Sequence, residues 1–195
     1  ALPISIYLGF AGINLAFTRM LLPALGIGRV LDPRPPRPDQ LRTELGWSMV
    51  SIAVFAVGTL LPWWAIRNGL LRVAADAPAA RIAVECLVLV VWNDLHFYAC
   101  HRLLHWKPLF HAVHARHHRS FVTTPFSTYC FHPVEAALLG SVMPLAMLLH
   151  DFSAWALLFL PVFSIAVNNM GHSNYDLFPA TRTGRFWAFS RRQDR

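Results

Sequence analysis

An uncharged apolar run of 21 residues, at positions 46–66, constrains the fold more than any other feature of this sequence. As an α-helix it would be about 31 Å long, which matches the roughly 30 Å hydrocarbon core of a bilayer. The run ends in Pro62, Trp63 and Trp64, and tryptophan is enriched at membrane interfaces. This segment is therefore predicted to span a membrane.

Four further segments are rich in apolar residues, at positions 2–17, 82–106, 134–149 and 152–168. Hydrophobic residues make up 55% of the chain, charged residues only 14%, and the mean hydropathy is +0.42. This composition is typical of membrane proteins. We predict an all-α integral membrane bundle with four to five transmembrane helices. It is expected to form one domain over residues 1–195, incomplete at both ends because the chain starts and stops without natural signals.

The basic residues predict how the bundle faces. Arginine and lysine number five in residues 19–45, a proline-rich solvent-side connector, four in residues 102–119 and five in residues 182–195, against three in residues 67–81. By the positive-inside rule, these fourteen of seventeen mark the cytoplasmic face of a bacterial inner membrane or the endoplasmic reticulum. The net charge of +7 therefore reflects topology, because the basic residues form no solvated stripe for nucleic acid.

Seven of the ten histidines lie within residues 94–119. They include an H-x-x-x-H pair and an H-x-x-H-H group, formed by His101, His105, His114, His117 and His118. Residues three and four apart share a helix face, so each group can aim several imidazoles at one point. Five convergent rings indicate more than one metal ion of intermediate softness. A zinc-protease site is not favoured, because Arg102 follows the first histidine where the H-E-x-x-H motif has its glutamate.

Three nearby side chains could support such a site. Asp94 falls within about 20° of the stripe of His101 and His105 on a helix and could orient an imidazole as a second-shell carboxylate. His111 precedes His114 by three residues and could join its face, most simply outside the metal ligands. His132 precedes Pro133 and Glu135, a pattern that predicts the start of a helix.

The chain resembles the fatty acid hydroxylase/sterol desaturase superfamily, particularly its sterol C-5 desaturase-like branch. The resemblance covers about residues 94–179 in both order and spacing. It is carried by the motifs His101-Arg-Leu-Leu-His105, His114-Ala-Arg-His117-His118, Thr124-Pro-Phe126, Phe131-His-Pro-Val-Glu135 and His172-Ser-Asn-Tyr-Asp176.

The resemblance implies an integral membrane oxidoreductase with two non-haem iron ions, which uses O2 and a cytochrome b5-like or ferredoxin-like electron donor to hydroxylate or desaturate a sterol or fatty-acyl lipid. It implies that the metal ligands are His101, His105, His114, His117, His118 and His172, and it raises a second-shell role for His132. The family has a further H-x-x-H-H group downstream of the segment matched by His172, which is expected beyond residue 195. Asp176, four residues after His172, could add a carboxylate on the same face.

Two other classes of function remain open from the residues alone. A membrane b-type cytochrome would hold haem between paired histidines, generally within the hydrocarbon, whereas three of these histidines cluster beyond a predicted helix end. A histidine-lined metal transporter would carry ionisable residues through the bundle, yet the segments 46–66 and 152–168 contain none.

Overall fold

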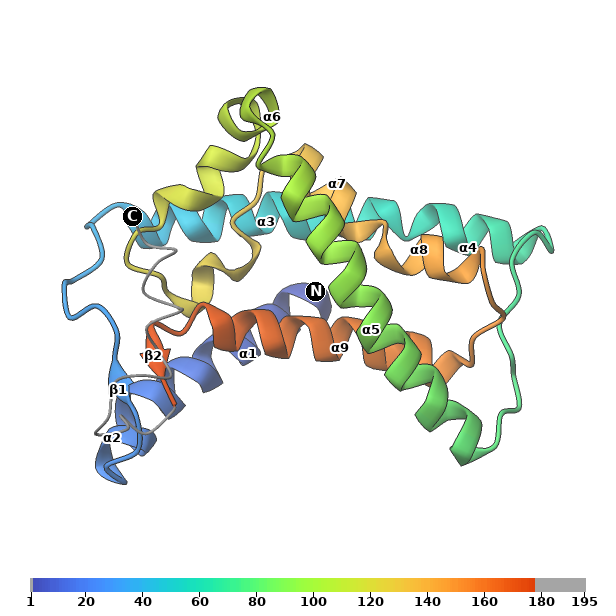
Figure 1. The fold of residues 1–195 in the computed structure, drawn as a ribbon, viewed down its shortest axis with the longest axis horizontal. Coiled ribbons are helices and arrows are strands. Elements are labelled where there is room, and N and C mark those ends of the chain that lie inside the picture. The colour runs from blue at the N-terminus through green and yellow to red at the C-terminus, as the bar shows by residue number, and fades with distance from the viewer. Residues whose placement is uncertain (1, 178–195) are drawn as a thin grey trace.

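The computed structural model describes residues 2–177, and their fold is a bundle of helices (Figure 1). Its longer helices are α1 (Leu2–Ala16), α3 (Gln40–Gly58), α4 (Leu60–Arg67), α5 (Ala79–Leu104) and α9 (Ala154–Gly171). The shorter ones are the π-helical turn η1 (Phe17–Leu21), α2 (Leu22–Ala24), α6 (Lys107–Ala112), the 3₁₀ turns η2 (His114–Arg119) and η3 (Pro125–Tyr129), α7 (Pro133–Gly140) and α8 (Val142–Met147). Two short strands, β1 (Arg29–Val30) and β2 (Tyr175–Asp176), pair antiparallel. The all-α prediction is confirmed.

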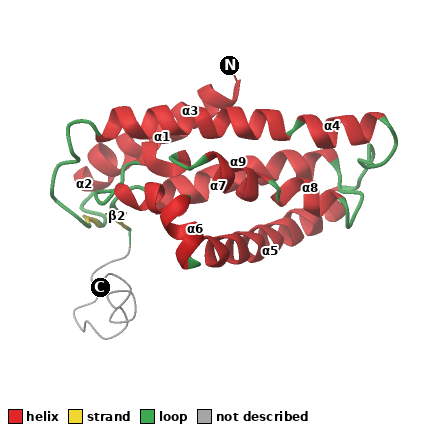
Figure 2. Ribbon diagram, turned by 90° about the horizontal axis from the view of Figure 1, so that it is seen from above, coloured by secondary structure: helices red, strands yellow, loops and turns green. Residues whose placement is uncertain are grey.

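Four helical segments of the described chain are long and apolar enough to cross a membrane: Pro3–Ala24, Gln40–Arg67, Ala79–Leu104 and Ala154–Gly171. A shorter apolar segment, Pro133–Met147, is formed by α7 and α8. Seen from above in Figure 2, α3–α4 and α5 form the outer rows, and α9, α7 and α8 lie between them. We predicted four to five membrane spans, and the described helices support four.

The solvent-side connector is shorter than the sequence predicted. The first helical segment continues through Arg19 to Ala24, and α3 already begins at Gln40, so only residues 25–39 connect them. No proline interrupts the chain between Ile4 and Leu22, and Pro23 lies at the start of α2. Arg19 thus belongs to a helix end, where a long basic side chain can reach toward water.

Two helical segments break four residues before a proline. α3 ends at Gly58, four before Pro62, and α7 ends at Gly140, four before Pro144. A proline cannot donate to the carbonyl four residues earlier, and its ring crowds that group. At each break a hydroxyl bonds a carbonyl three residues back, at 2.7 Å from Thr59 to Ala56 and 2.7 Å from Ser141 to Leu138. The polar groups at these breaks are therefore partly satisfied within the bundle.

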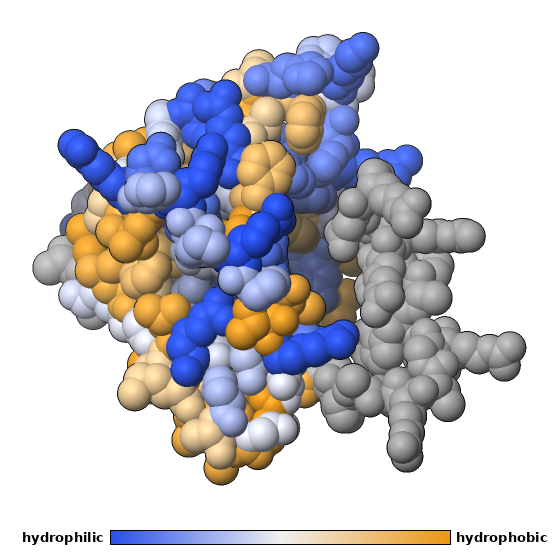
Figure 3. Space-filling view, turned by 90° about the vertical axis from the view of Figure 1, so that its left-hand side faces the viewer, coloured by the Kyte–Doolittle hydropathy of each residue, from blue (hydrophilic) through white to orange (hydrophobic). Residues whose placement is uncertain are grey.

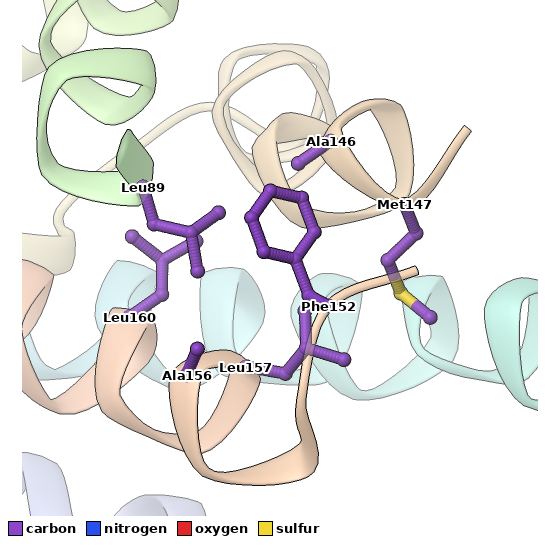
Figure 4. Close-up of a cluster of buried hydrophobic side chains, with 7 residues drawn as sticks. All are labelled: Leu89, Ala146, Met147, Phe152, Ala156, Leu157 and Leu160. Carbon is purple, nitrogen blue, oxygen red and sulfur yellow. The ribbon is translucent and has the colours of Figure 1, made fainter. Parts of the chain in front are cut away.

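The hydrophobic core lies between α5, α8 and α9 (Figure 4). Leu89 of α5 and Leu160 of α9 are fully buried against each other's helices, and Phe152 packs from the segment before α9. The remaining members of this cluster are Ala146, Met147, Ala156 and Leu157. Close packing here fixes the angle at which α5 crosses the bundle (Figure 1), and hence where its last turn ends.

The loops gather at the two ends of the bundle as the predicted topology requires. At one end, the connector contacts the histidine segments, since Arg37 donates to the Arg119 carbonyl and the Asp32 amide to Asn174 Oδ1. Figure 3 looks onto this end and shows many hydrophilic side chains on it. At the other end, Arg81 forms an ion pair with Glu85 at 2.8 Å and also donates to the Asp151 carbonyl.

Candidate metal centre

Four histidine rings meet where α5 ends and η2 begins. His101 and His105 lie on the last turn of α5 and just after it, and their Nε2 atoms are 3.1 Å apart. His114 and His118 lie at the two ends of one turn of η2, with their Nε2 atoms 3.0 Å apart. The ring centroid of His105 is 4.9 Å from that of His114 and 5.2 Å from that of His118. We call these four residues the four-histidine cluster.

Ligand atoms of His101, His105 and His114 all lie within 4.8 Å of one another. Such a group can close around a single ion with small side-chain rotations, since metal–nitrogen bonds are near 2.0–2.1 Å. Burial lowers the pKa of His105 and His118, and the neighbouring ring of His114 lowers both further. The 3.0–3.1 Å contacts within the cluster join ring nitrogens, and a bound cation would replace these contacts with metal–nitrogen bonds.

His117 belongs to a second group, which it forms with His172. Its ring lies 5.1 Å from that of His172, the residue that follows α9, and 5.1 Å from that of Phe131. Burial, and to a smaller extent the charge of the neighbouring His172, lowers the pKa of His117 to about 3. Burial lowers the pKa of His172 to about 4. Nδ1 of His117 is buried and makes no hydrogen bond within residues 2–177. We call these two residues the His117–His172 pair.

The H-x-x-H-H group folds as the 3₁₀ turn η2 and not as an α-helix, and its three histidines are shared between the two clusters. With about three residues per turn, His114 and His117 stack along η2, with ring centroids 5.7 Å apart. His118 then turns toward the four-histidine cluster. The six predicted histidines are thus brought together as four and two, joined through η2.

Two buried partners orient rings in these clusters, and the sequence pattern did not assign either one. Glu135, in the first turn of α7, accepts from His114 Nδ1 at 2.8 Å, and both side chains are only 1% exposed. Ser127 donates to the Thr124 carbonyl at 2.7 Å, so its oxygen is left to accept from His172 Nδ1 at 2.9 Å. A proton on Nδ1 in each case would leave Nε2 as the ligand nitrogen.

The remaining candidates lie outside both clusters. Asp94 is exposed and near Asn93, with 3.5 Å between the amide nitrogen and a carboxylate oxygen. His111 is exposed and contacts the edge of Phe110. His132 begins α7 as predicted, accepting from the Val134 amide at 3.2 Å.

Asp176 does not share a helix face with His172, because α9 ends at Gly171. It lies in β2, opposite Arg29, with 3.4 Å between the guanidinium and the carboxylate. The spacing argument for Asp176 as a ligand on the same face therefore does not hold in this fold.

The fold and this site together define a class: a membrane-embedded helical protein with a histidine cluster that could hold a metal ion at one end of its bundle. Residues 86–195 match the family of fatty acid hydroxylases, and this chain belongs to that family. No solved structure was found that resembles it.

The curated relatives include sterol desaturases. The chain is 27% identical over 149 residues to a Delta(7)-sterol 5(6)-desaturase of Candida glabrata, covering 69% of this chain and 41% of that protein. It is 34% identical over 129 residues to the Delta(7)-sterol 5(6)-desaturase of Saccharomyces cerevisiae, covering 60% and 35%. A very-long-chain aldehyde decarbonylase of Oryza sativa subsp. japonica is 32% identical over 138 residues, covering 67% and 20%. The chain thus spans about two fifths or less of these relatives.

Proposed function

We propose that this chain carries the metal centre of a membrane-bound, O2-dependent oxidoreductase that hydroxylates or desaturates a sterol or fatty-acyl lipid. The observation that carries the proposal is the four-histidine cluster, whose rings converge at the end of a membrane-spanning helix. The names of its desaturase and decarbonylase relatives support a lipid substrate.

The donor set suits non-haem iron. Imidazole nitrogens suit iron in the divalent state, and the buried, unpartnered Nδ1 of His117 is a further nitrogen within the site. The four-histidine cluster would hold one ion, and the His117–His172 pair would contribute to the second. Bound iron would supply the O2 activation and C–H bond cleavage that no amino-acid side chain can perform.

The protein's own residues hold and orient this centre. Glu135 and Ser127 fix the rings of His114 and His172, so that each presents Nε2. Leu89, Leu160 and Phe152 keep α5 and α9 packed together, and these helices carry His101 and precede His172. The geometry of the site is therefore set by the membrane bundle.

The reaction also requires an outside electron source. Reduction of O2 to water takes four electrons, of which C–H oxidation supplies two, so two must come from a donor. A small redox protein of the cytochrome b5 or ferredoxin type meets this need. It would approach the end of the bundle that carries the histidines and, by the positive-inside rule, we place this end in the cytoplasm of a bacterium or on the cytoplasmic face of the endoplasmic reticulum.

Iron content tests the metal centre. The chain would be purified in detergent, loaded anaerobically with Fe²⁺, freed of loose metal and analysed for iron per chain. His114→Ala should lose most of the bound iron, whereas His111→Ala, three residues away but exposed and outside the cluster, should keep it. Equal iron in all three proteins would refute the site, and a Soret band would point to a haem protein.

Activity tests the reaction. Iron-loaded protein in lipid vesicles would be supplied with a reduced donor, O2 and either a sterol or a fatty-acyl lipid, and the products would be identified by mass spectrometry. A product heavier by one oxygen indicates hydroxylation, and one lighter by two hydrogens indicates desaturation. Consumption of O2 without an oxidised lipid, for a protein that holds iron, would reject the proposed reaction.

A further inference from the structure

Glu135 is a buried carboxylate with too few partners. It is 1% exposed, one of its oxygens is bonded to His114 Nδ1, and Oε2 makes no hydrogen bond within residues 2–177. An ionised carboxylate in such surroundings is costly unless positive charge or further donors compensate it. Its position in the first turn of α7 offers part of this compensation, through the positive end of the helix.

A second buried glutamate shows what full compensation looks like in the same bundle. Glu85 is 4% exposed and is bonded by Arg81 at 2.8 Å, by the Ser153 amide at 2.8 Å and by His150 at 3.2 Å. A guanidinium, an amide and an imidazole thus surround this carboxylate. Glu135 has the imidazole and no cationic side chain bonded to it.

The backbone and ring of His132 also act on Glu135, and its other link leads to the four-histidine cluster. The only side chain bonded to Glu135 in the described chain is His114, and the other nitrogen of that ring points into the four-histidine cluster, 3.0 Å from His118 Nε2. A cation bound by the cluster would be linked to the carboxylate through one imidazole. Carboxylate–histidine–metal chains of this kind orient the ring and strengthen its ligand nitrogen.

We propose that Glu135 is a positioning residue that keeps the Nδ1 proton on His114 and thereby presents Nε2 to a divalent metal ion held by the four-histidine cluster. This inference deepens the proposed function and rests on its metal centre. It assigns Glu135 a role that local spacing does not indicate, since the two residues are 21 positions apart.

The first readout is metal affinity without turnover. Metal-free protein in detergent would be titrated with Co²⁺, whose visible absorption reports binding to nitrogen ligands. Glu135→Gln removes the charge at constant size, and Glu135→Ala also removes the acceptor, so we expect about 10–100-fold weaker binding, with alanine the weaker of the two. Glu85→Gln makes the same change at the other buried, histidine-bonded glutamate and should leave the Co²⁺ affinity unchanged.

The second readout is the tautomer of His114 in the metal-free protein, measured by ¹⁵N spectroscopy of histidine-labelled samples. In the wild type the proton should be on Nδ1, and in Glu135→Ala it should move largely to Nε2. A simple packing role for Glu135 would not alter this distribution. Because the wild-type measurement needs no variant, it decides the question even if a variant fails to fold.

The outcomes separate the two ideas. Tight Co²⁺ binding by the wild type with equal affinity in Glu135→Gln and Glu135→Ala would overturn the role of Glu135 and leave the metal centre in place. If the wild type binds no Co²⁺ but has the proton on Nδ1 of His114, the metal centre is refuted, while the effect of Glu135 on the His114 tautomer stands. A proton on Nε2 of His114 in the wild type would refute the positioning role directly.

Discussion

Lowering the pH from 7 to 5 should destabilise the metal-free protein by about 3–4 kcal/mol through the His117–His172 pair alone. Burial lowers the pKa of His117 to about 3 and that of His172 to about 4, whereas a histidine in an unfolded chain titrates near 6.5. Between these values the unfolded chain binds protons that the folded protein does not. Stability is therefore fully present above about pH 6.5 and falls as the pH drops through this window.

The magnitude follows from the proton balance. Well inside the window each histidine contributes a slope of about 1.4 kcal/mol per pH unit, and integration from pH 7 to 5 gives about 1.9 kcal/mol for each. Below about pH 3 both forms are protonated and the slope should vanish. Because the two rings lie only 5.1 Å apart, a charge on one would also repel a charge on the other.

The assay is the free energy of unfolding in detergent with a chelator present, measured at pH 7 and pH 5. His117→Phe keeps a flat ring and removes one titrating group, so it should lose about half of this pH dependence. His111→Phe, at an exposed position, should keep the wild-type dependence. The reasoning is wrong if His117→Phe and the wild type show the same difference between the two pH values.

Three further outcomes are expected. His105→Ala should lower the iron content at least severalfold while leaving thermal stability nearly unchanged, because this ring is exposed at the end of the bundle; retention of full iron by elemental analysis would count against it. His150→Ala should cost about 1 kcal/mol of unfolding free energy, for one lost hydrogen bond, with no change in iron content. Gly28→Ala should cost more than the roughly 1–2 kcal/mol of its left-handed backbone, because its new methyl group would meet the Asp176 carbonyl and push β1 from β2; hydrogen exchange of β2 would show this. Gly26→Ala has a similar positive φ in open space, and an equal effect there would exclude the clash.

Helix positions followed from the sequence because the bilayer's thickness and the apolar runs determine them. The segment predicted at 82–106 forms α5 at Ala79–Leu104, and that predicted at 152–168 forms α9 at Ala154–Gly171. The spacing of His101 and His105 placed both rings together at the end of α5, since residues four apart share a helical face. Local periodicity was sufficient for these features.

The division of the histidines could not be read from that periodicity. An α-helical period places His114, His117 and His118 on one face, whereas in the structure His117 lies beside His172, which comes from the distant end of α9. Glu135 shows a related limit, because its contact with His114 depends on how α7 packs beside η2. Contacts between distant segments are set by tertiary packing, which a single sequence does not display.

The order of the ligands along the chain has a consequence for biosynthesis. All of the four-histidine cluster lies between His101 and His118, and it emerges from the ribosome as soon as α5 and η2 have been made. Glu135 follows shortly afterwards, before α9 exists. The first ion could thus bind to a nascent chain, whereas the His117–His172 pair must wait for the last described span to insert. Metal supply and membrane insertion would then be coupled in time, with the first ion loaded during synthesis and the second only after it.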